Sequence, residues 1–464
     1  MLLFIFPIIL SNALQTLYTT ADQLIVGQFS GDPNALAAIG STSYISSLII
    51  NFVIGINAGC GVVVAQAVGS KDNDRIEKST HNVFILSTIV SLIMTVVAFA
   101  TAAPLLRLLG TKEELFDSAL LYVRIIFAGI PASALYNASA AIIRATGDSA
   151  TPLRVATVSG LLNVLLNLVF VLGFNASVAG VAIATIISHY FSAATCIYHL
   201  YRQKGESYAF SPKKLIPDKR LLLHMLRLGI PAGLQSICLN IANMASAAAT
   251  NSFDGTVYVS AKSIATDIDN LTATVATGFL PATMNAVGQN VGAKKPERVK
   301  RVFFYGLLQS AVIMFVLSST LNIFVGDIAK LYIEADDPDI LAKIEAVVAW
   351  SGVILPLQFL NGTHNSSIGA LRGLGYSILP LTLNLIGAVG TRLAWIYFVF
   401  NPLPTRELSD FRTLAVMYPI SVAVTTVLLS VASIIALVKM KKKQEQEALS
   451  EENSDESELA ASKS

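Results

Sequence analysis

The stretches VAQAVGSKDNDRIEK (residues 64–78) and VGQNVGAKKPERVKR (residues 287–301) each follow a long apolar segment, far apart in the chain. They share three residues at a constant offset of 223 residues, in the pairs Gln66 with Gln289, Gly69 with Gly292 and Arg75 with Arg298. Glycine ends helices and arginine keeps its charge at the rim of a membrane, so one such stretch indicates only a helical turn. Its repetition indicates a duplicated chain.

A second pair of turns supports the duplication. IIRATGDSATP (residues 142–152) matches ALRGLGYSILP (residues 370–380) at an offset of 228, and two prolines, Pro7 and Pro231, begin the series at an offset of 224. Each copy holds six apolar segments. Because six is even, both copies enter a membrane in the same orientation, as in secondary transporters whose binding cavity lies between or within the halves.

The composition places the chain in a membrane. Of its 464 residues, 54% are hydrophobic and only 13% are charged, whereas about a quarter of the residues in soluble domains are charged. The formal net charge of +2 gives no support for a nucleic-acid partner. The three cysteines lie inside apolar runs, so we expect small buried side chains rather than a disulfide framework or a metal site.

Stretches of about twenty apolar residues recur twelve times, which predicts twelve transmembrane helices and an all-α polytopic protein with two parallel six-helix repeats. We expect an amino-terminal lobe at residues 1–201, with its first helix shortened at the start of the chain, and an inter-lobe linker at 202–220. A carboxy-terminal lobe at 221–438 and a disordered tail at 439–464 follow, because the last segment is charged, serine-rich and without an apolar face. We expect a monomer.

The basic residues predict the orientation in the membrane. Most lie in one set of connections, which includes the linker and the tail, and only six lie in or near the opposite set: Arg107, Lys112, Lys330, Lys343, Arg406 and Arg412. By the positive-inside rule the first set is cytoplasmic. We therefore expect a multi-pass protein of the plasma membrane with both termini in the cytoplasm.

The first helix carries a polar stripe that ends in an acid. At about 100° per residue, Asn12, Gln15, Tyr18, Thr19 and Asp22 fall within an arc of roughly 120°. Hydrogen bonds between packed helices could explain the amides and hydroxyls of this stripe. A carboxylate at membrane depth is costly, so it favours a functional role for Asp22.

Other polar residues lie in later spans. Asn163 and Asn167 are one helical turn apart, and Thr185 lies in the next span. The two asparagines could be interhelical hydrogen-bonding groups, or their carbonyl oxygens could complete a cation or proton-relay site with Asp22.

In the second half, KSIATDIDN offers Lys262, Asp267 and Asp269 within one span. Lys262 and Asp269 share a helix face, so they could form a structural ion pair or part of a substrate or second ion site. Asp22 has no acidic counterpart at Ser246, the position that an offset of 224 predicts. Arg392 also lies within a span, and we expect it to be a structural partner or a residue at the rim of a cavity.

Taken together, these features resemble the multidrug and toxic compound extrusion (MATE) family. The resemblance rests on twelve spans in two halves, a proline in the first helix, the D-x-x-x-V-G pattern from Asp22 to Gly27, the Q-x-x-G turns and the R-x-x-G turn at Arg144. It implies a transporter that exports organic cations and other amphipathic compounds in exchange for H⁺ or Na⁺, with no other cofactor.

The resemblance also implies residue roles. Pro7 is similar to a proline at which the first helix bends, Asp22 to the coupling carboxylate, and Asn163 and Thr185 to its polar companions. Many similar members have an aspartate where this chain has Asn167, so a site with two carboxylates is not available here. Asp269 resembles an acidic position in the eighth span of some relatives.

The sequence therefore predicts a cation-coupled antiporter that exports drug-like, cationic organic compounds by alternating access. In the outward-facing form, Asp22 would lose a proton or bind Na⁺ and so drive substrate release. A related alternative is a lipid-linked saccharide flippase, which would need a more basic central cavity. An enzyme is not expected, because no HExxH, GxSxG or Cys/His motif is present.

Overall fold

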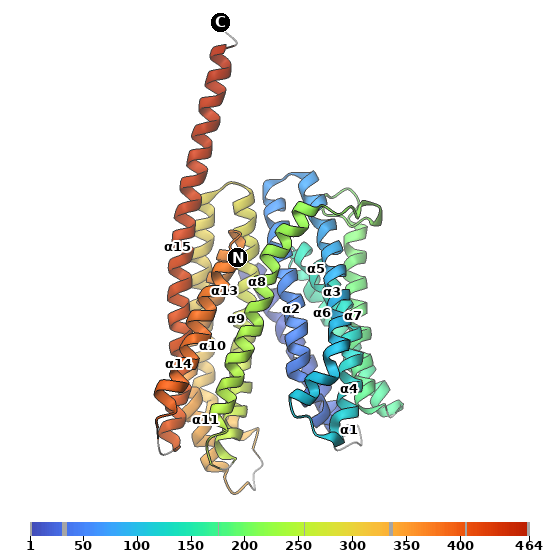
Figure 1. Cartoon of the computed structure of the whole chain (residues 1–464), viewed down its shortest axis with the longest axis vertical. Helices are drawn as coiled ribbons and strands as arrows, with labels where there is room; N and C mark the ends of the chain where they lie inside the picture. Colours follow the sequence, from blue (N-terminus) through green and yellow to red (C-terminus); the bar gives the residue numbers. More distant parts are fainter. Residues whose placement is uncertain are drawn as a thin grey trace.

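The computed structural model describes residues 2–29, 35–174, 176–254, 256–333, 337–403 and 406–461, and it is helical almost throughout (Figure 1). Long apolar segments fold as helices because the backbone polar groups find no water in a bilayer and must bond within the segment. The amino-terminal lobe contains α1 (Leu2–Phe29), α2 (Ala35–Ser70), α3 (Asn73–Leu108), α4 (Glu113–Ala128), α5 (Ile130–Ala145), α6 (Ala150–Leu168), the π-helical η1 (Val169–Gly173) and α7 (Ser177–Arg202).

The carboxy-terminal lobe has the same succession of elements. After the short η2 (Pro212–Lys214), it contains α8 (Lys219–Thr250), α9 (Val257–Gly292), α10 (Pro296–Lys330), α11 (Ile340–Ile354), η3 (Leu355–Leu357), α12 (Phe359–Gly373), α13 (Ile378–Asn384), the π-helical η4 (Leu385–Gly390), α14 (Thr391–Trp395), the π-helical η5 (Ile396–Phe400) and α15 (Leu408–Ala461). The span made of α4 and α5 corresponds to that of α11, η3 and α12. The span made of α6 and η1 corresponds to that of α13 to η5.

Twelve helical spans are therefore present in the described part of the chain. Eleven of them are long and apolar enough to cross a membrane. The twelfth is α9, which has 36 residues but also carries three charged side chains, Lys262, Asp267 and Asp269. The predicted fold class, twelve helices in two six-helix repeats, is confirmed.

The repeat is visible in the backbone of the turns. Lys71 and Lys294, which follow α2 and α9, adopt the left-handed conformation with φ of 57° and 54°. Gly147 and Gly375, which follow α5 and α12, have φ of 99° and 92°, a conformation in which glycine is favoured over other residues. The motifs that the sequence repeats thus form the same turns in both lobes.

The lobes touch where α2 and α8 run side by side (Figure 1). A Cβ atom added to Gly55 would lie 2.5 Å from Gly233 Cα, and one added to Gly59 would lie 2.4 Å from Gly229 N. The four glycines therefore let the two backbones meet, as small residues do between membrane helices. Gly55 and Gly59 lie in the half of α2 that ends at Ser70, and Gly229 and Gly233 lie in the half of α8 that begins at Lys219.

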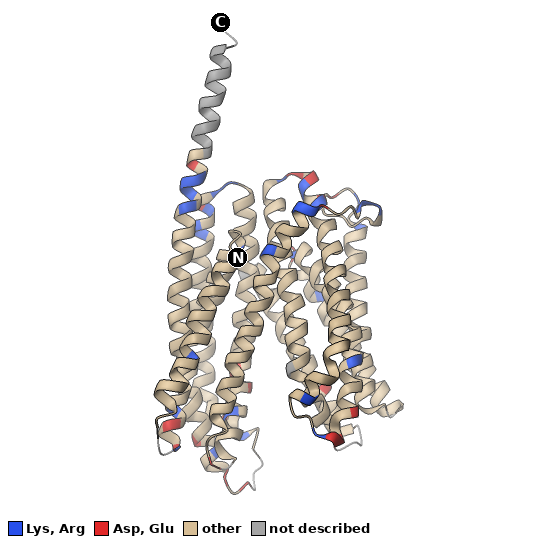
Figure 2. Ribbon diagram, in the orientation of Figure 1, with Lys and Arg blue, Asp and Glu red and all other residues tan. Residues whose placement is uncertain are grey.

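One end of the molecule carries most of the basic side chains (Figure 2). This basic end contains the turns at residues 70–73 and 292–296, the linker at 202–219 and the start of α15's extension past residue 438. The linker packs against α3: Asn82 Oδ1 accepts a hydrogen bond from Asp218 N at 2.8 Å, and His81 Nε2 accepts one from Ser211 N at 3.0 Å.

The expectation of a disordered tail from residue 439 differs from the structure. Residues 439–446 continue α15 as a helix. Lys441 Nζ lies 2.8 Å from Glu297 Oε1 at the start of α10, and 3.9 Å from Glu445 Oε1 one turn further along α15. Lysine, glutamate and glutamine favour helices, and the ion pair of Lys441 with Glu297 is an exposed contact between α15 and α10 of the same lobe.

Candidate functional site

The polar stripe of α1 brings the Asp22 carboxylate against two other helices of the amino-terminal lobe. Asp22 Oδ1 accepts a hydrogen bond from Asn167 Nδ2 at the end of α6, and Asp22 Oδ2 lies 3.4 Å from Thr185 Oγ1 of α7. Asp22 is partly buried, and Asn167 is fully buried. A charged acceptor held by an amide and a hydroxyl is a stronger pairing than one between neutral groups.

Asn163 joins this group through Thr185. Its Nδ2 lies 3.4 Å from Thr185 Oγ1, which also lies 2.9 Å from the Val181 carbonyl one turn before it. Asn167 Oδ1 is buried and has no hydrogen-bond partner among the described residues. A buried acceptor without a partner is uncommon, so a proton donor or a cation that reached this oxygen would satisfy it.

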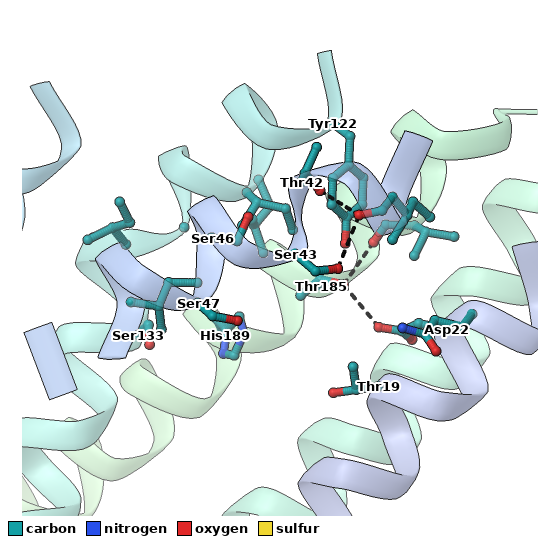
Figure 3. A pocket seen from close by; sticks show the side chains of 18 residues that line it. Thr19, Asp22, Thr42, Ser43, Ser46, Ser47, Tyr122, Ser133, Thr185 and His189 are labelled. Carbon is teal, nitrogen blue, oxygen red and sulfur yellow. Dashed lines mark hydrogen bonds between the residues drawn. The ribbon is translucent and has the colours of Figure 1, made fainter. Parts of the chain in front are cut away.

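Two cavities adjoin Asp22. One has a volume of about 210 Å³ and is lined on one side by hydroxyl groups of α2, including Thr42 and Ser43 (Figure 3). The other has a volume of about 250 Å³ and is lined by Gln15, Tyr18 and Asn163. Asp22, Thr185 and His189 line both cavities, so the carboxylate can be reached from either one.

Tyr18 is positioned by a glycine. A Cβ atom added to Gly160 of α6 would lie 1.7 Å from Tyr18 Cε2, and the Tyr18 hydroxyl donates to the Thr157 carbonyl at 3.3 Å. The ring therefore packs directly against α6 because residue 160 has no side chain.

The charged residues expected in the carboxy-terminal lobe also line a cavity. Lys262, Asp267 and Asp269 of α9 border a volume of about 800 Å³, together with Arg392 and Trp350. Of the two alternatives for Lys262 and Asp269, the structure does not show the ion pair. Lys262 Nζ donates to Ser246 Oγ and Thr250 Oγ1, both at 2.8 Å, and Asp269 Oδ1 accepts from Gln358 Nε2 at 3.0 Å. Sharing a helix face did not bring the two charges together, because seven residues along a helix separate them by about 10.5 Å. Each side chain bonds to neutral groups from another segment.

The comparisons with known proteins agree with this architecture. The MatE family model matches residues 7–169 and 231–398, most of both lobes. The chain belongs to the multidrug and toxic compound extrusion (MATE) family, a family of membrane transporters.

Similar proteins cover nearly the whole chain. The probable multidrug resistance protein YoeA of Bacillus subtilis (strain 168) is 26% identical over 437 residues, which is 92% of each chain. The probable multidrug resistance protein YpnP of the same organism is 29% identical over 386 residues, 83% of this chain and 84% of YpnP. A crystal structure of MATE in the straight conformation superposes with a TM-score of 0.86 at 21% identity, covering 95% of this chain and 96% of that one.

Within this MATE fold, the first helix contacts both lobes. α1 contains Pro7 as part of a continuous helix, and Ile5 and Ile8 on either side of it are buried against Ala276 and Phe279 of α9. Further along, Ile25 and Val26 pack within their own lobe, against Val171 and Val181. The bending expected at Pro7 stays a prediction.

Sequence reasoning missed several residues of the carboxy-terminal cavity. Arg392 was expected to be a structural partner or at the rim of a cavity, and it is one of the residues that line this cavity. Trp350, Tyr418 and Gln358 were not singled out. The signals that marked this cavity in the sequence were its charged residues, Lys262, Asp267 and Asp269 of α9 and Arg392, because aromatic residues are common in all spans.

Proposed function

We propose that this MATE protein is a cation-coupled antiporter that exports organic compounds by alternating access, with Asp22 as the coupling carboxylate. The observation that carries the proposal is the contact of Asp22 with Asn167 and Thr185 between two cavities. An ionisable group within a membrane span that is reached from cavities is typical of ion pathways.

The site has groups for either H⁺ or Na⁺. A proton would bind directly to the Asp22 carboxylate. For Na⁺, oxygen ligands are available from Asp22, from the Thr185 hydroxyl and from the unpartnered Oδ1 of Asn167, after a rotation of its amide. Residue 167 is an asparagine, and Asp22 is the only carboxylate among the described residues that line the two cavities, which supports a single coupling ion in the amino-terminal lobe.

The contact between the lobes supports an outward-facing state. The glycine contacts of α2 and α8 lie toward the basic end, which the positive-inside rule assigns to the cytoplasm. Both termini are then cytoplasmic, and the protein lies in the plasma membrane. Binding of the ion to this state would favour it over the inward-facing one only by its difference in affinity for the two states.

The proposed substrates are drug-like organic compounds, as the names of YoeA and YpnP suggest for those relatives. The Asp22 carboxylate favours a cationic group in the amino-terminal cavities. A lipid-linked saccharide flippase is less well supported, because two acids accompany the two basic residues in the carboxy-terminal cavity.

The test uses purified protein in proteoliposomes loaded with a fluorescent organic cation. Efflux is measured under an imposed pH gradient and, separately, under a Na⁺ gradient. We expect one gradient to drive transport by the wild type and Asp22→Asn to abolish the driven component. Asp117→Asn serves as a matched control, because Asp117 is exposed on α4.

Each result decides the proposal. Loss of driven efflux in Asp22→Asn with normal efflux in Asp117→Asn supports it, and the effective gradient names the ion. Driven efflux by Asp22→Asn at the wild-type rate would show that the polar stripe is structural. Absence of driven efflux in the wild type, with either gradient, would overturn the antiporter itself.

A further inference from the structure

The carboxy-terminal cavity contains two buried cations. Only 9% of Lys262 and 8% of Arg392 is exposed, and both line the volume of about 800 Å³ between α8, α9, α11 and α15. Lysine and arginine are rarely buried to this degree without an acidic partner, because the loss of hydration is costly. Their surroundings therefore need an explanation.

Lys262 is held by hydroxyl groups alone. Its ammonium group donates to Ser246 and Thr250 and lies 5.4 Å from the centre of the Trp350 ring. An ammonium group has three N–H donors, and these two bonds leave the third without a protein acceptor among the described residues. The indole face offers an additional electrostatic attraction to the cation.

Arg392 has a similar neutral environment. Its Nε donates to Ser421 Oγ at 3.0 Å and one of its terminal nitrogens donates to Asn243 Oδ1 at 2.8 Å. Its guanidinium carbon lies 4.5 Å from the centre of the Tyr418 ring. Three of its five N–H donors make no hydrogen bond to the described part of the protein.

The two cations belong to one network. The Tyr418 hydroxyl, whose ring lies against Arg392, donates to Ser246 Oγ at 3.0 Å, the same oxygen that accepts from Lys262. Within the described residues, no carboxylate oxygen lies within 4.0 Å of either cation. Asp269 in the same cavity is bonded to Gln358 instead.

The two lobes differ in the residue at the position of Asp22. Ser246 stands at the position that the offset of 224 assigns to Asp22. In the amino-terminal lobe this position holds a carboxylate that receives hydrogen bonds from neutral groups. In the carboxy-terminal lobe it holds a hydroxyl that receives a hydrogen bond from a cation, so the sign of the charge at the equivalent site is reversed.

We infer that Lys262 and Arg392 form a subsite for the anionic group of an exported aromatic compound, and that this group is a carboxylate. The inference rests on the proposed export function. Spare N–H donors on both cations match the acceptor oxygens of a carboxylate. Trp350 and Tyr418, whose ring centres lie 5.8 Å apart, provide the adjoining aromatic surface. Asp267 in the same cavity would take a positive group at the other end of the compound.

The experiment compares two forms of one probe, a rhodamine dye with a free carboxylate and the methyl ester of the same dye. Each is titrated into the purified full-length protein in detergent, and binding is followed by fluorescence anisotropy. We expect the wild type to bind the free acid about tenfold more tightly than the ester, the effect of one hydrogen bond between charged groups. Lys262→Met and Arg392→Gln should each weaken binding of the free acid about tenfold and leave the ester unchanged.

The variants are expected to fold. The partners of Lys262 are hydroxyl groups, so Lys262→Met leaves no opposite charge buried and unpaired. Lys330→Met is the matched control, because Lys330 is exposed at the end of α10. It should keep the tenfold preference of the wild type. If the ester binds as tightly as the free acid to the wild type, or if the two variants weaken both forms equally, the subsite is overturned.

Two further measurements separate the related proposals. Asp22→Asn should keep the preference for the free acid, even where it abolishes gradient-driven efflux. If the wild type binds the free acid more tightly than the ester but shows no gradient-driven efflux, the antiporter alone is overturned. If it shows driven efflux but binds both forms equally, this subsite alone is overturned. Unlabelled competitors test the chemical class of the anion. If a short isoprenoid diphosphate displaces the free acid at a lower concentration than aromatic carboxylates do, the subsite binds a lipid phosphate and the assignment to a carboxylate is overturned.

Discussion

Gln66 and Gln289, which the repeat places at equivalent positions, each donate a side-chain hydrogen bond to a backbone carbonyl of the opposite lobe. Gln66 Nε2 lies 3.0 Å from the Gly373 carbonyl oxygen, and Gln289 Nε2 lies 2.6 Å from the Ala145 carbonyl oxygen. Ala145 and Gly373 are themselves repeat equivalents, at the ends of α5 and α12. The two motifs that reveal the duplication thus bind each other reciprocally across the interface at the basic end.

Gly69 lies in the same motif as Gln66, and its substitution should separate the two lobes at this contact. A Cβ atom on Gly69 would lie 1.9 Å from the Gln289 carbonyl oxygen. Because this neighbour is backbone, Gly69→Ala should destabilise the closed basic end by about 1–3 kcal/mol. We expect a lower Tm of the purified protein and a longer distance between spin labels placed on the two lobes.

Gly40→Ala is the matched control, because it changes the same residue type in the same helix. Among the described residues, no atom beyond the adjoining turns of α2 lies within 4 Å of a Cβ added to Gly40, and alanine is the better helix former. This variant should keep or raise the Tm. A Gly69→Ala protein with the Tm and label distance of Gly40→Ala would show that the contact at the basic end does not hold the lobes together.

The close approach of Tyr18 and Gly160 makes a second prediction. Gly160→Ala should displace the Tyr18 ring from the cavity beside Asp22 and lower stability by about 1–3 kcal/mol, the usual cost of overpacking. Removing the ring by Tyr18→Ala should relieve the clash. We expect Gly160→Ala combined with Tyr18→Ala to have the stability of Tyr18→Ala alone, measured as Tm in a double-mutant cycle. Additive losses in the double variant would contradict the clash.

Much of the architecture could be predicted from the sequence because turns and apolar periods are local properties. The repeated glycines and arginines marked the same turns in both lobes, and the polar stripe of α1 identified Asp22. The family resemblance implied that Asn163 and Thr185 accompany Asp22, and the sequence left open whether Asn167 joins them; the structure brings these residues together.

Contacts between helices were harder to predict. Spacing along a helix says which residues share a face, but not which neighbouring helix that face meets. Lys262 and Asp269 share a face, yet Lys262 bonds to α8 and Asp269 bonds to Gln358. The hydrogen bonds from Gln66 to Gly373 and from Gln289 to Ala145 likewise depend on how the two lobes dock, which no local sequence pattern predicts.

Outside the spans, Asp148 should make stability depend on pH. Partial burial raises the pKa of its carboxyl, but the Thr151 hydroxyl at 2.5 Å and the backbone N–H groups of Thr151 and Ala150, both at 2.9 Å, outweigh burial and place the pKa below the ordinary 3.8. A lowered pKa stabilises the fold above the unfolded-state value. This stabilisation is lost as the pH falls through 3.8 and then through the lower folded-state pKa.

Asp148→Asn should therefore lower stability by about 1 kcal/mol at neutral pH and by less below pH 3.8, where the wild type loses the same charge. The measurement is the difference in Tm between the two proteins across this range. Thr151→Val, which removes one donor, should show part of the same pH dependence. A Tm difference that stays constant from neutral to acidic pH would exclude this role for the Asp148 charge.

The contacts of Asp22 predict an order of effects on coupling. Asn167→Leu removes the closest donor to the carboxylate, so it should reduce gradient-driven efflux most among its neighbours, by about tenfold or more. Thr185→Val should have a smaller effect because its hydroxyl lies 3.4 Å away and also bonds to Val181. Asn163→Leu should have the smallest, because Asn163 reaches Asp22 only through Thr185.

The same proteoliposome measurement tests this order, with Thr20→Val as the control for Thr185→Val. Thr20 is exposed on α1 two residues before Asp22, and among the described residues its hydroxyl bonds to the Thr16 carbonyl of its own helix. Thr20→Val should transport as the wild type does. If Asn163→Leu impaired coupling more than Asn167→Leu, the ion would be held between Asn163 and Thr185, and the hydrogen bond from Asn167 to Asp22 would have a structural role only.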